Sequence, residues 1–99
     1  MGEMTASRVV TVQNPAGLHL RPVTRIAETA IRFQARIEIV KEGLRVDARS
    51  VLDLATLVAK QGDVLRLEAE GADAEAALQS LEELFSSESF INTTTKSGD

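Results

Sequence analysis

Apolar and polar residues alternate along several short stretches of this 99-residue chain, which is the pattern of half-buried β-strands. Strands are predicted at 8–13, at 36–41, around 44–48 and at 65–70. Glu42-Gly43 separates the second from the third, so these two are expected to form a hairpin. The segment Asn14-Pro15-Ala16-Gly17 ends the first strand, because Asn, Pro and Gly favour turns.

Three other stretches repeat apolar residues at the spacing of a helix that buries one face. Pro22 fits the first turn of the first helix, where a missing N–H costs no hydrogen bond. A short second helix is expected from Ser50, with Leu54 and Leu57 turned inward, and Asp73 is a natural N-cap for the third. The buried face of the first helix is expected to contain Val23, Ile26, Ala27, Ala30 and Ile31.

The element order predicts a two-layer α+β sandwich, because helices with one apolar stripe need a sheet face to cover. Arg66, Glu68 and Glu70 are then expected on the open face of the sheet. The domain should span residues 8–85, with a flexible N-terminus at 1–7. Residues 86–99 are polar and without periodicity, so they are expected to form a flexible C-terminal tail, in which Phe90 and Ile91 could touch the body.

Charge and composition exclude several classes of protein. The net charge is −4, the basic residues are scattered and aromatic residues are few, which argues against DNA or RNA as a partner. The chain has no cysteine, so it forms neither disulfides nor thiolate metal sites. No apolar run reaches the roughly 20 residues that span a bilayer, and residues 1–7 lack a signal pattern. We therefore expect a cytoplasmic protein with no membrane insertion.

The one histidine, His19, lies between a turn that contains glycine and Pro22, which puts it at or just before a helix N-terminus. The first N–H groups of a helix lack intrahelical partners and favour an anion. Arg21 adds a cation whose fork of donors suits phosphate. These residues favour a phosphoryl acceptor, although a surface histidine that only caps the helix has the same pattern. A metal site is not expected, because no second histidine or cysteine could complete it.

The segment Gly17-Leu18-His19-Leu20-Arg21-Pro22 resembles the active-site motif of HPr, the histidine-containing phosphocarrier of the phosphoenolpyruvate-dependent sugar phosphotransferase system. The resemblance continues through 48–52, 61–63 and 70–74 and covers most of residues 8–85. It implies an open-faced sandwich, a four-stranded antiparallel sheet with three helices on one face. It also implies that enzyme I phosphorylates the Nδ1 atom of His19, assisted by Arg21, and that an EIIA domain of a sugar permease receives the group. Such a carrier is a monomer without a cofactor, and it is a transfer intermediate rather than an independent catalyst.

Two further sites follow from the resemblance. Ser50 is expected to be the N-cap of the short helix, and many HPr proteins are phosphorylated by a kinase at this serine, which weakens transfer at the histidine. Asp53 follows it where the family has a glycine or a basic residue, which adds negative charge. Partners are expected to dock on an apolar patch that consists of Leu20, Val23, Thr24, Val51, Leu52 and Ala55.

Three functions remain open at the level of the sequence. The favoured one is phosphoryl transfer from enzyme I to an EIIA domain for sugar uptake. The same carrier chemistry would also serve a regulatory phosphorelay that imports no sugar. In a non-catalytic module that only binds an anion at the helix N-terminus, Arg21 would remain important and His19 would be replaceable.

Overall fold

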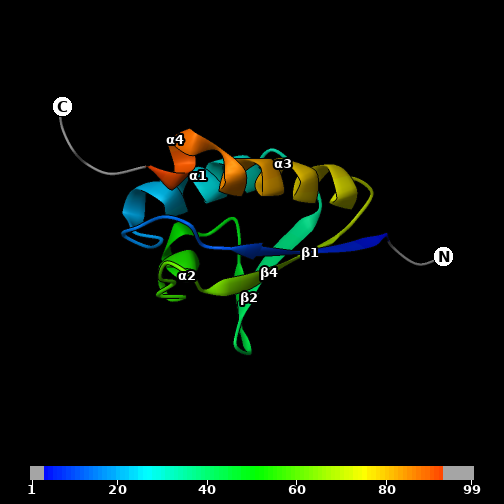
Figure 1. Ribbon diagram of the computed structural model, residues 1–99. Coiled ribbons are helices and arrows are strands. Elements are labelled where there is room, and N and C mark those ends of the chain that lie inside the picture. The colour runs from blue at the N-terminus through cyan, green and yellow to red at the C-terminus, as the bar shows by residue number, and fades with distance from the viewer. Residues whose placement is uncertain (1–3, 93–99) are drawn as a thin grey trace.

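The computed structural model describes residues 4–92, and its strands and helices follow the predicted order with one helix added at the end (Figure 1). The strands are β1 (Thr5–Thr11), β2 (Arg36–Lys41), β3 (Leu44–Asp47) and β4 (Val64–Glu70). The helices are α1 (Leu20–Ala30), α2 (Val51–Ala55), α3 (Ala74–Ser86) and α4 (Glu88–Ile91).

The four strands form one sheet in the order β1-β4-β2-β3, and every neighbouring pair is antiparallel. β2 and β3 form the predicted hairpin, in which Lys41 pairs with Leu44. β1 starts earlier than expected, because residues 5–7 pair with residues 68–70 of β4. The expected flexible segment 1–7 is therefore wrong for these three residues, and residues 1–3 lie outside the described part of the chain.

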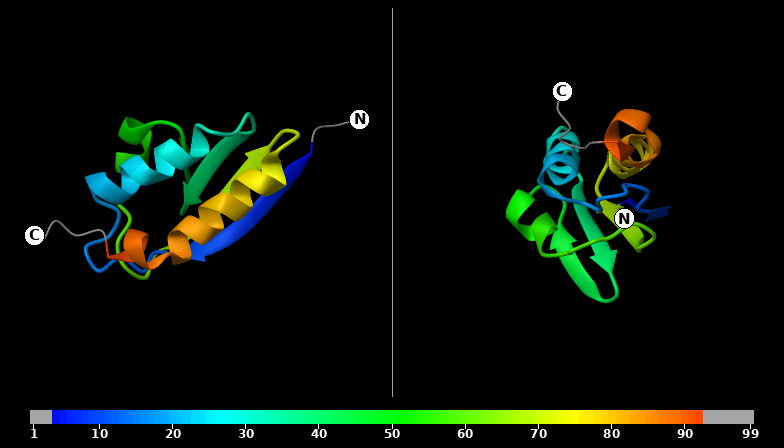
Figure 2. Two further views of the ribbon diagram at one scale, coloured as in Figure 1. Left: turned by 90° about the horizontal axis from the view of Figure 1, so that it is seen from above. Right: turned by 60° about the vertical axis from the view of Figure 1, so that its left-hand side comes forward.

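Helices α1 and α3 lie side by side over one face of the sheet, while α2 packs against the start of α1 and the end of β3 (Figures 1 and 2). Along β4, buried Leu65, Leu67 and Ala69 alternate with Arg66, Glu68 and Glu70, which lie on the open face as predicted. This arrangement confirms the α+β open-faced sandwich.

Charged side chains cover the open face of the sheet. Arg45 of β3 contacts Glu38 at 2.9 Å and Glu68 at 2.6 Å, and Arg66 contacts Glu68 at 2.9 Å. The hydrogen bond from Arg45 holds the pKa of the Glu68 carboxyl below its usual range. This network gives the open face a solvated, charge-paired surface, and none of the predicted site residues belongs to it.

The core lies between the sheet and the helices and is almost entirely aliphatic. Ile26, Ile37, Leu67 and Leu78 are fully buried there. Ile31, expected on the buried face of α1, is instead its C-cap and is 63% exposed. The backbone of Ile31 is still helical, with φ −68° and ψ −15°, but Ile31 stands at the very end of α1, where Thr29 and Ala30 are the buried residues instead.

The C-terminal segment differs most from expectation. α3 continues to Ser86, and the short helix α4 follows after Ser87, whose hydroxyl accepts a hydrogen bond from Phe90 N at 3.3 Å. The Phe90 side chain is fully buried and its ring centroid lies 5.0 Å from that of Phe85. The tail expected from residue 86 is therefore ordered structure through residue 92, and residues 93–99 lie outside the described chain. No helix between residues 4 and 92 has the length and apolar character needed to cross a bilayer.

Candidate functional site

His19 is the N-cap residue of α1. Its backbone is extended, with φ −82° and ψ −168°, and its carbonyl accepts a hydrogen bond from Val23 N at 3.1 Å. Within the described chain the imidazole makes no capping hydrogen bond, and the first turn of α1 has no acidic residue. The first N–H groups of the helix are those of Leu20 and Arg21, because Pro22 has no N–H. No acidic side chain in the first turn of this 11-residue helix therefore offsets the partial positive charge at its N-terminus, next to His19.

His19 lies between two shallow surface hollows of different character. On one side, a groove along α1 is lined by Leu20, Arg21, Thr24, Arg25 and Glu28 as well as His19. On the other side, an apolar hollow between α1 and α2 is lined by His19 with Leu18, Leu20, Val23, Ala55, Val58 and Ala59. The imidazole therefore has two cationic side chains and the Glu28 carboxylate in one neighbouring groove, and an apolar surface in the other.

The backbone before His19 is held against the segment after α2. Leu18 N donates to Ala59 O at 3.0 Å, and Gly17 N donates to Asn14 O at 2.8 Å. Gly17 has φ +74°, and a Cβ atom there would lie 2.6 Å from Ala59 O. Position 17 therefore requires glycine both for its left-handed backbone and for the close approach of the two segments.

Ser50 is the N-cap of α2, as predicted. Its hydroxyl accepts a hydrogen bond from Asp53 N at 3.1 Å. The Asp53 carboxylate does not complete a capping box with Ser50 N; it lies 3.4 Å from Asp47 N, and Ser50 N donates to Asp47 O. Ser50 is partly exposed and lines neither of the hollows beside His19.

The structure separates the predicted docking residues into three groups. Leu20 and Leu52 are 69% and 81% exposed, and Ala55 is also exposed. Thr24 and Val51 are partly exposed, and the Thr24 hydroxyl is tied back to Leu20 O at 2.8 Å. Val23 lines the apolar hollow but is only 1% exposed, so it offers a partner almost no surface of its own. Its position in the helical repeat already placed it on the buried face of α1.

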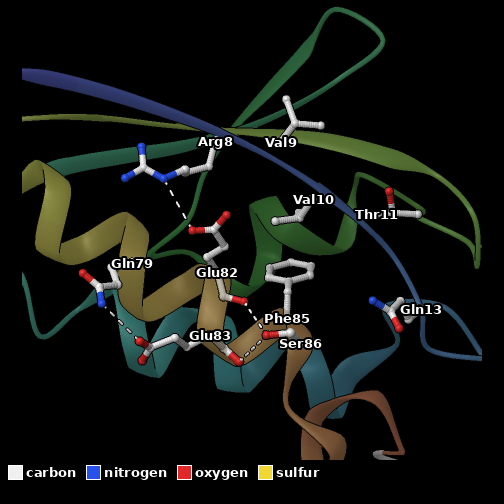
Figure 3. A pocket seen from close by; sticks show the side chains of 10 residues that line it. All are labelled: Arg8, Val9, Val10, Thr11, Gln13, Gln79, Glu82, Glu83, Phe85 and Ser86. Carbon is white, nitrogen blue, oxygen red and sulfur yellow. Dashed lines mark hydrogen bonds and ion pairs between the residues drawn. The ribbon is translucent and has the colours of Figure 1, made fainter.

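A third hollow lies between β1 and α3 (Figure 3). Its polar side chains pair with one another: Arg8 Nε lies 3.4 Å from Glu82, and the Gln79 amide donates from Nε2 to Glu83 at 3.3 Å. None of the predicted site residues lines this hollow. Among residues 4–92, no three His, Cys, Asp or Glu side chains come together as a metal site would require.

Three residues near His19 were not predicted from the sequence. Arg25 lines the polar groove and donates to Ser89 Oγ of α4 at 3.2 Å. Val58 lines the apolar hollow, is 67% exposed and has φ +47°, an unusual conformation for a β-branched residue. Asn14 is 2% exposed and its amide reaches α4. Arg25 follows Arg21 by one helical turn of α1, so the helical spacing could have found it. The sequence gives no periodic signal for Val58 or Asn14.

Comparisons with known proteins agree with the fold. The family model described as PTS HPr component phosphorylation site matches residues 6–87. A phosphocarrier protein HPr from Treponema pallidum is 40% identical over 78 residues, which cover 79% of this chain and 89% of that protein. The crystal structure of HPr-C-His from Thermoanaerobacter tengcongensis has a TM-score of 0.80 at 34% identity and covers 87% of this chain and 94% of that one.

A relative with a different name matches the same domain. The phosphoryl donor subunit DhaM of a dihydroxyacetone kinase, from Providencia stuartii, is 38% identical over 73 residues, which are 74% of this chain but 15% of that protein. Together with the fold, these similarities define a small phosphocarrier domain. The chain belongs to the HPr family of the phosphotransferase system.

Proposed function

We propose that His19 accepts a phosphoryl group from enzyme I and passes it to an EIIA domain for sugar uptake. The group originates in phosphoenolpyruvate and stays on the carrier only between two encounters with other proteins. In this proposal the carrier works in the cytoplasm as a monomer. One surface around His19 serves each partner in turn. Membership of the HPr family supports this role in phosphoryl transfer.

The observation that carries the proposal is the position of His19 at the start of α1, with Arg21 in the same groove. In each transfer a nitrogen lone pair attacks phosphorus while the bond from phosphorus to the donor nitrogen breaks. The resemblance to HPr makes Nδ1 of His19 the attacking atom, and the other ring nitrogen keeps its proton. Negative charge spreads over the equatorial oxygens in the transition state. The helix N-terminus and the Arg21 guanidinium supply donors that stabilise this charge.

Exposed apolar residues around His19 support the docking part of the proposal. Leu20, Leu52 and Ala55 are exposed, and Leu20 and Ala55 line the apolar hollow next to the imidazole. Apolar surface that remains exposed beside a reactive group is a typical site for transient protein contacts. Docking there excludes water from the phosphoryl group while it moves between the two nitrogen atoms.

Ser50 is the proposed site of regulation by a kinase. A phosphate at this position would add about −2 charge at the start of α2, next to Asp53. It would also lie close along the chain to Val51 and Leu52, which belong to the proposed docking surface. The added charge would weaken docking of both partners, while the chemistry at His19 would stay the same.

The test uses the full chain, enzyme I of the same organism and labelled phosphoenolpyruvate. We expect acid-labile label on the unaltered protein and none on His19→Ala, with the fold of the variant checked by circular dichroism. Adding a purified EIIA domain should then move the label from the carrier to that domain. Label that persists on His19→Ala would exclude His19 as the acceptor.

A regulatory relay is the second candidate, because the relative DhaM is named as the phosphoryl donor subunit of a dihydroxyacetone kinase. The two roles share the first transfer and differ in the acceptor. A labelled carrier that passes its group to a kinase subunit but to no EIIA domain favours the relay. A chain that binds phosphate but is never labelled would instead be an anion-binding module.

A further inference from the structure

Asn14 is a buried amide in the loop that carries His19. Its Nδ2 atom donates to the carbonyl oxygen of Phe90 in α4 at 2.7 Å. Among residues 4–92, its Oδ1 is the buried side-chain atom for which no hydrogen-bond partner is found. A buried amide that satisfies only half of its groups is a poor source of stability. The contact therefore calls for an explanation other than stability.

The acceptor of this hydrogen bond is firmly fixed. The Phe90 side chain is fully buried against Phe85, and the Ser87 hydroxyl caps α4. Phe90 O also accepts from Asn92 N, so it keeps a partner when Asn14 is changed. Figures 1 and 2 show α4 beside the loop between β1 and α1. The loop before His19 is thus tied to a rigid point in the C-terminal segment.

A second contact joins the same helix to the site. Arg25 Nη1 donates to Ser89 Oγ at 3.2 Å, and Arg25 lines the groove that contains His19 and Arg21. One element, α4, therefore holds the backbone that leads to His19 and also holds a cation of its groove. The two contacts involve different residues on both sides, so they support the same role independently.

We infer that α4 is a clamp that positions His19 for phosphoryl transfer, and that Asn14 is the positioning residue through which it acts. This inference rests on the proposed function of His19. In-line transfer between two nitrogen atoms depends on sub-ångström placement, and a misplacement of about 1 Å costs on the order of 100-fold in rate. The clamp restricts the conformations of the loop at residues 14–19, so that His19 is held closer to the geometry that transfer requires.

The test is the variant Asn14→Leu in the full chain, since leucine has the same branching but cannot donate. We expect its thermal midpoint to stay within about 4 °C of the parent, because an unsatisfied polar atom is removed together with one hydrogen bond. The transfer rate from enzyme I at saturation should fall about 10-fold with little change in KM, because positioning and not docking is lost. The Leu18 amide should also exchange with solvent faster.

A matched control separates positioning from general loss of stability. Ile37→Val removes one methyl group from a fully buried side chain of β2 and should lower the thermal midpoint by about 5 °C without changing the saturated rate. If Asn14→Leu does not fold, Ser89→Ala, which changes one exposed hydroxyl group, becomes the test, with an expected twofold to threefold lower rate. A folded Asn14→Leu, or in its absence Ser89→Ala, with the parental rate would overturn the clamp.

The proposed function and the clamp fail in different ways. If the parent chain is never phosphorylated, the proposed function fails before the variants are compared on rate. The imidazole resonances of His19, the only histidine, then still report on the clamp by NMR. Unchanged ring resonances and unchanged Leu18 exchange in Asn14→Leu would overturn it without any reference to transfer.

Discussion

The start of α1 and the start of α2 differ in what their N-cap residues do. Ser50 uses its hydroxyl to accept a hydrogen bond from Asp53 N, whereas the His19 side chain makes no capping bond within the described chain. An acidic residue occupies the first turn of α2 but not that of α1. The start of α2 is therefore capped by its own side chain, while the amide groups at the start of α1 would face the phosphoryl group of the proposed function.

α3 shows a third use of a helix start. Its N-cap residue Asp73 does not cap its own helix; the carboxylate instead accepts hydrogen bonds from Gln34 N at 2.9 Å and Ala35 N at 2.8 Å. The carboxylate thus fastens the turn between α1 and β2 onto the start of α3. The same position on three helices serves a proposed reaction, a local cap and a long-range tie.

Arg21→Ala should give the largest change among the tests of this comparison. Loss of a donor that stabilises transition-state charge costs about 100-fold to 1000-fold in transfer rate. The transfer rate of Arg21→Lys should lie between the rates of Arg21→Ala and the parent, since lysine keeps the charge but lacks the fork of donors. Single-turnover labelling from phosphorylated enzyme I measures both. Equal rates for all three proteins would mean that the helix N-terminus alone stabilises the phosphoryl group.

Ser50→Asp should weaken docking at the start of α2 without loss of the cap, since Asp is also a good N-cap residue. The extra negative charge beside Asp53 should raise KM for enzyme I by about fivefold, equivalent to ~1 kcal/mol of docking free energy. The saturated rate should not change. A parental KM for this variant, measured at low and at physiological salt, would remove the basis for regulation by charge at Ser50.

Ser50→Ala should affect folding rather than transfer. Loss of the N-cap hydrogen bond lowers the free energy of unfolding by about 1 kcal/mol. Urea denaturation followed by circular dichroism measures the change, and Ser50→Thr is the control because it retains a hydroxyl group. The rate of labelling at His19 should equal that of the parent. A large loss of transfer in a folded Ser50→Ala would show that the two helix starts are not independent.

Acid should weaken the tie at Asp73, with the smallest effect of the four. Hydrogen bonds from Gln34 N and then Ala35 N lower the pKa of the Asp73 carboxyl. Its contribution to stability is fully present above the unfolded-state value of about 3.9 and is lost as the pH falls through the lower folded-state pKa. Asp73→Asn should therefore be less stable than the parent at pH 7, and the two should converge well below pH 4. Urea denaturation midpoints of Asp73→Asn and the parent, measured at several pH values, test this expectation.

The pattern of hydrophobic residues predicted the strands and helices that are long enough to contain a repeat. The strands, the hairpin and the long helices all follow from alternation or helical spacing, as Leu65, Leu67 and Ala69 on β4 illustrate. α4 has only four residues, so it is too short to show a repeat. The burial of Phe90 depends on Phe85 and on Asn14, which is 76 positions away in the sequence. No local pattern contains that information.

Local chemistry predicted the start of α1 for a similar reason. Glycine, histidine, arginine and proline stand within six consecutive positions, so the segment that contains His19 and Arg21 could be recognised directly. Val23 shows the limit of a transferred assignment: the resemblance put it on the docking surface, while its helical position put it in the core. Arg25 shares a face of α1 with Arg21, four positions earlier, so the helical repeat could have indicated it, whereas Val58 joins the surroundings of His19 only through tertiary packing.

The pair of rings at Phe85 and Phe90 makes α4 optically visible. The protein has no tryptophan or tyrosine and only three phenylalanines, so its near-ultraviolet dichroism comes from phenylalanine alone. Two of these rings are buried and tilted by 52° at a centroid distance of 5.0 Å, and Phe33 is only partly buried. Undocking of α4 would separate the pair and erase most of this spectrum. The chain therefore contains its own spectroscopic reporter of the C-terminal helix, and a tryptophan introduced elsewhere would fluoresce without background.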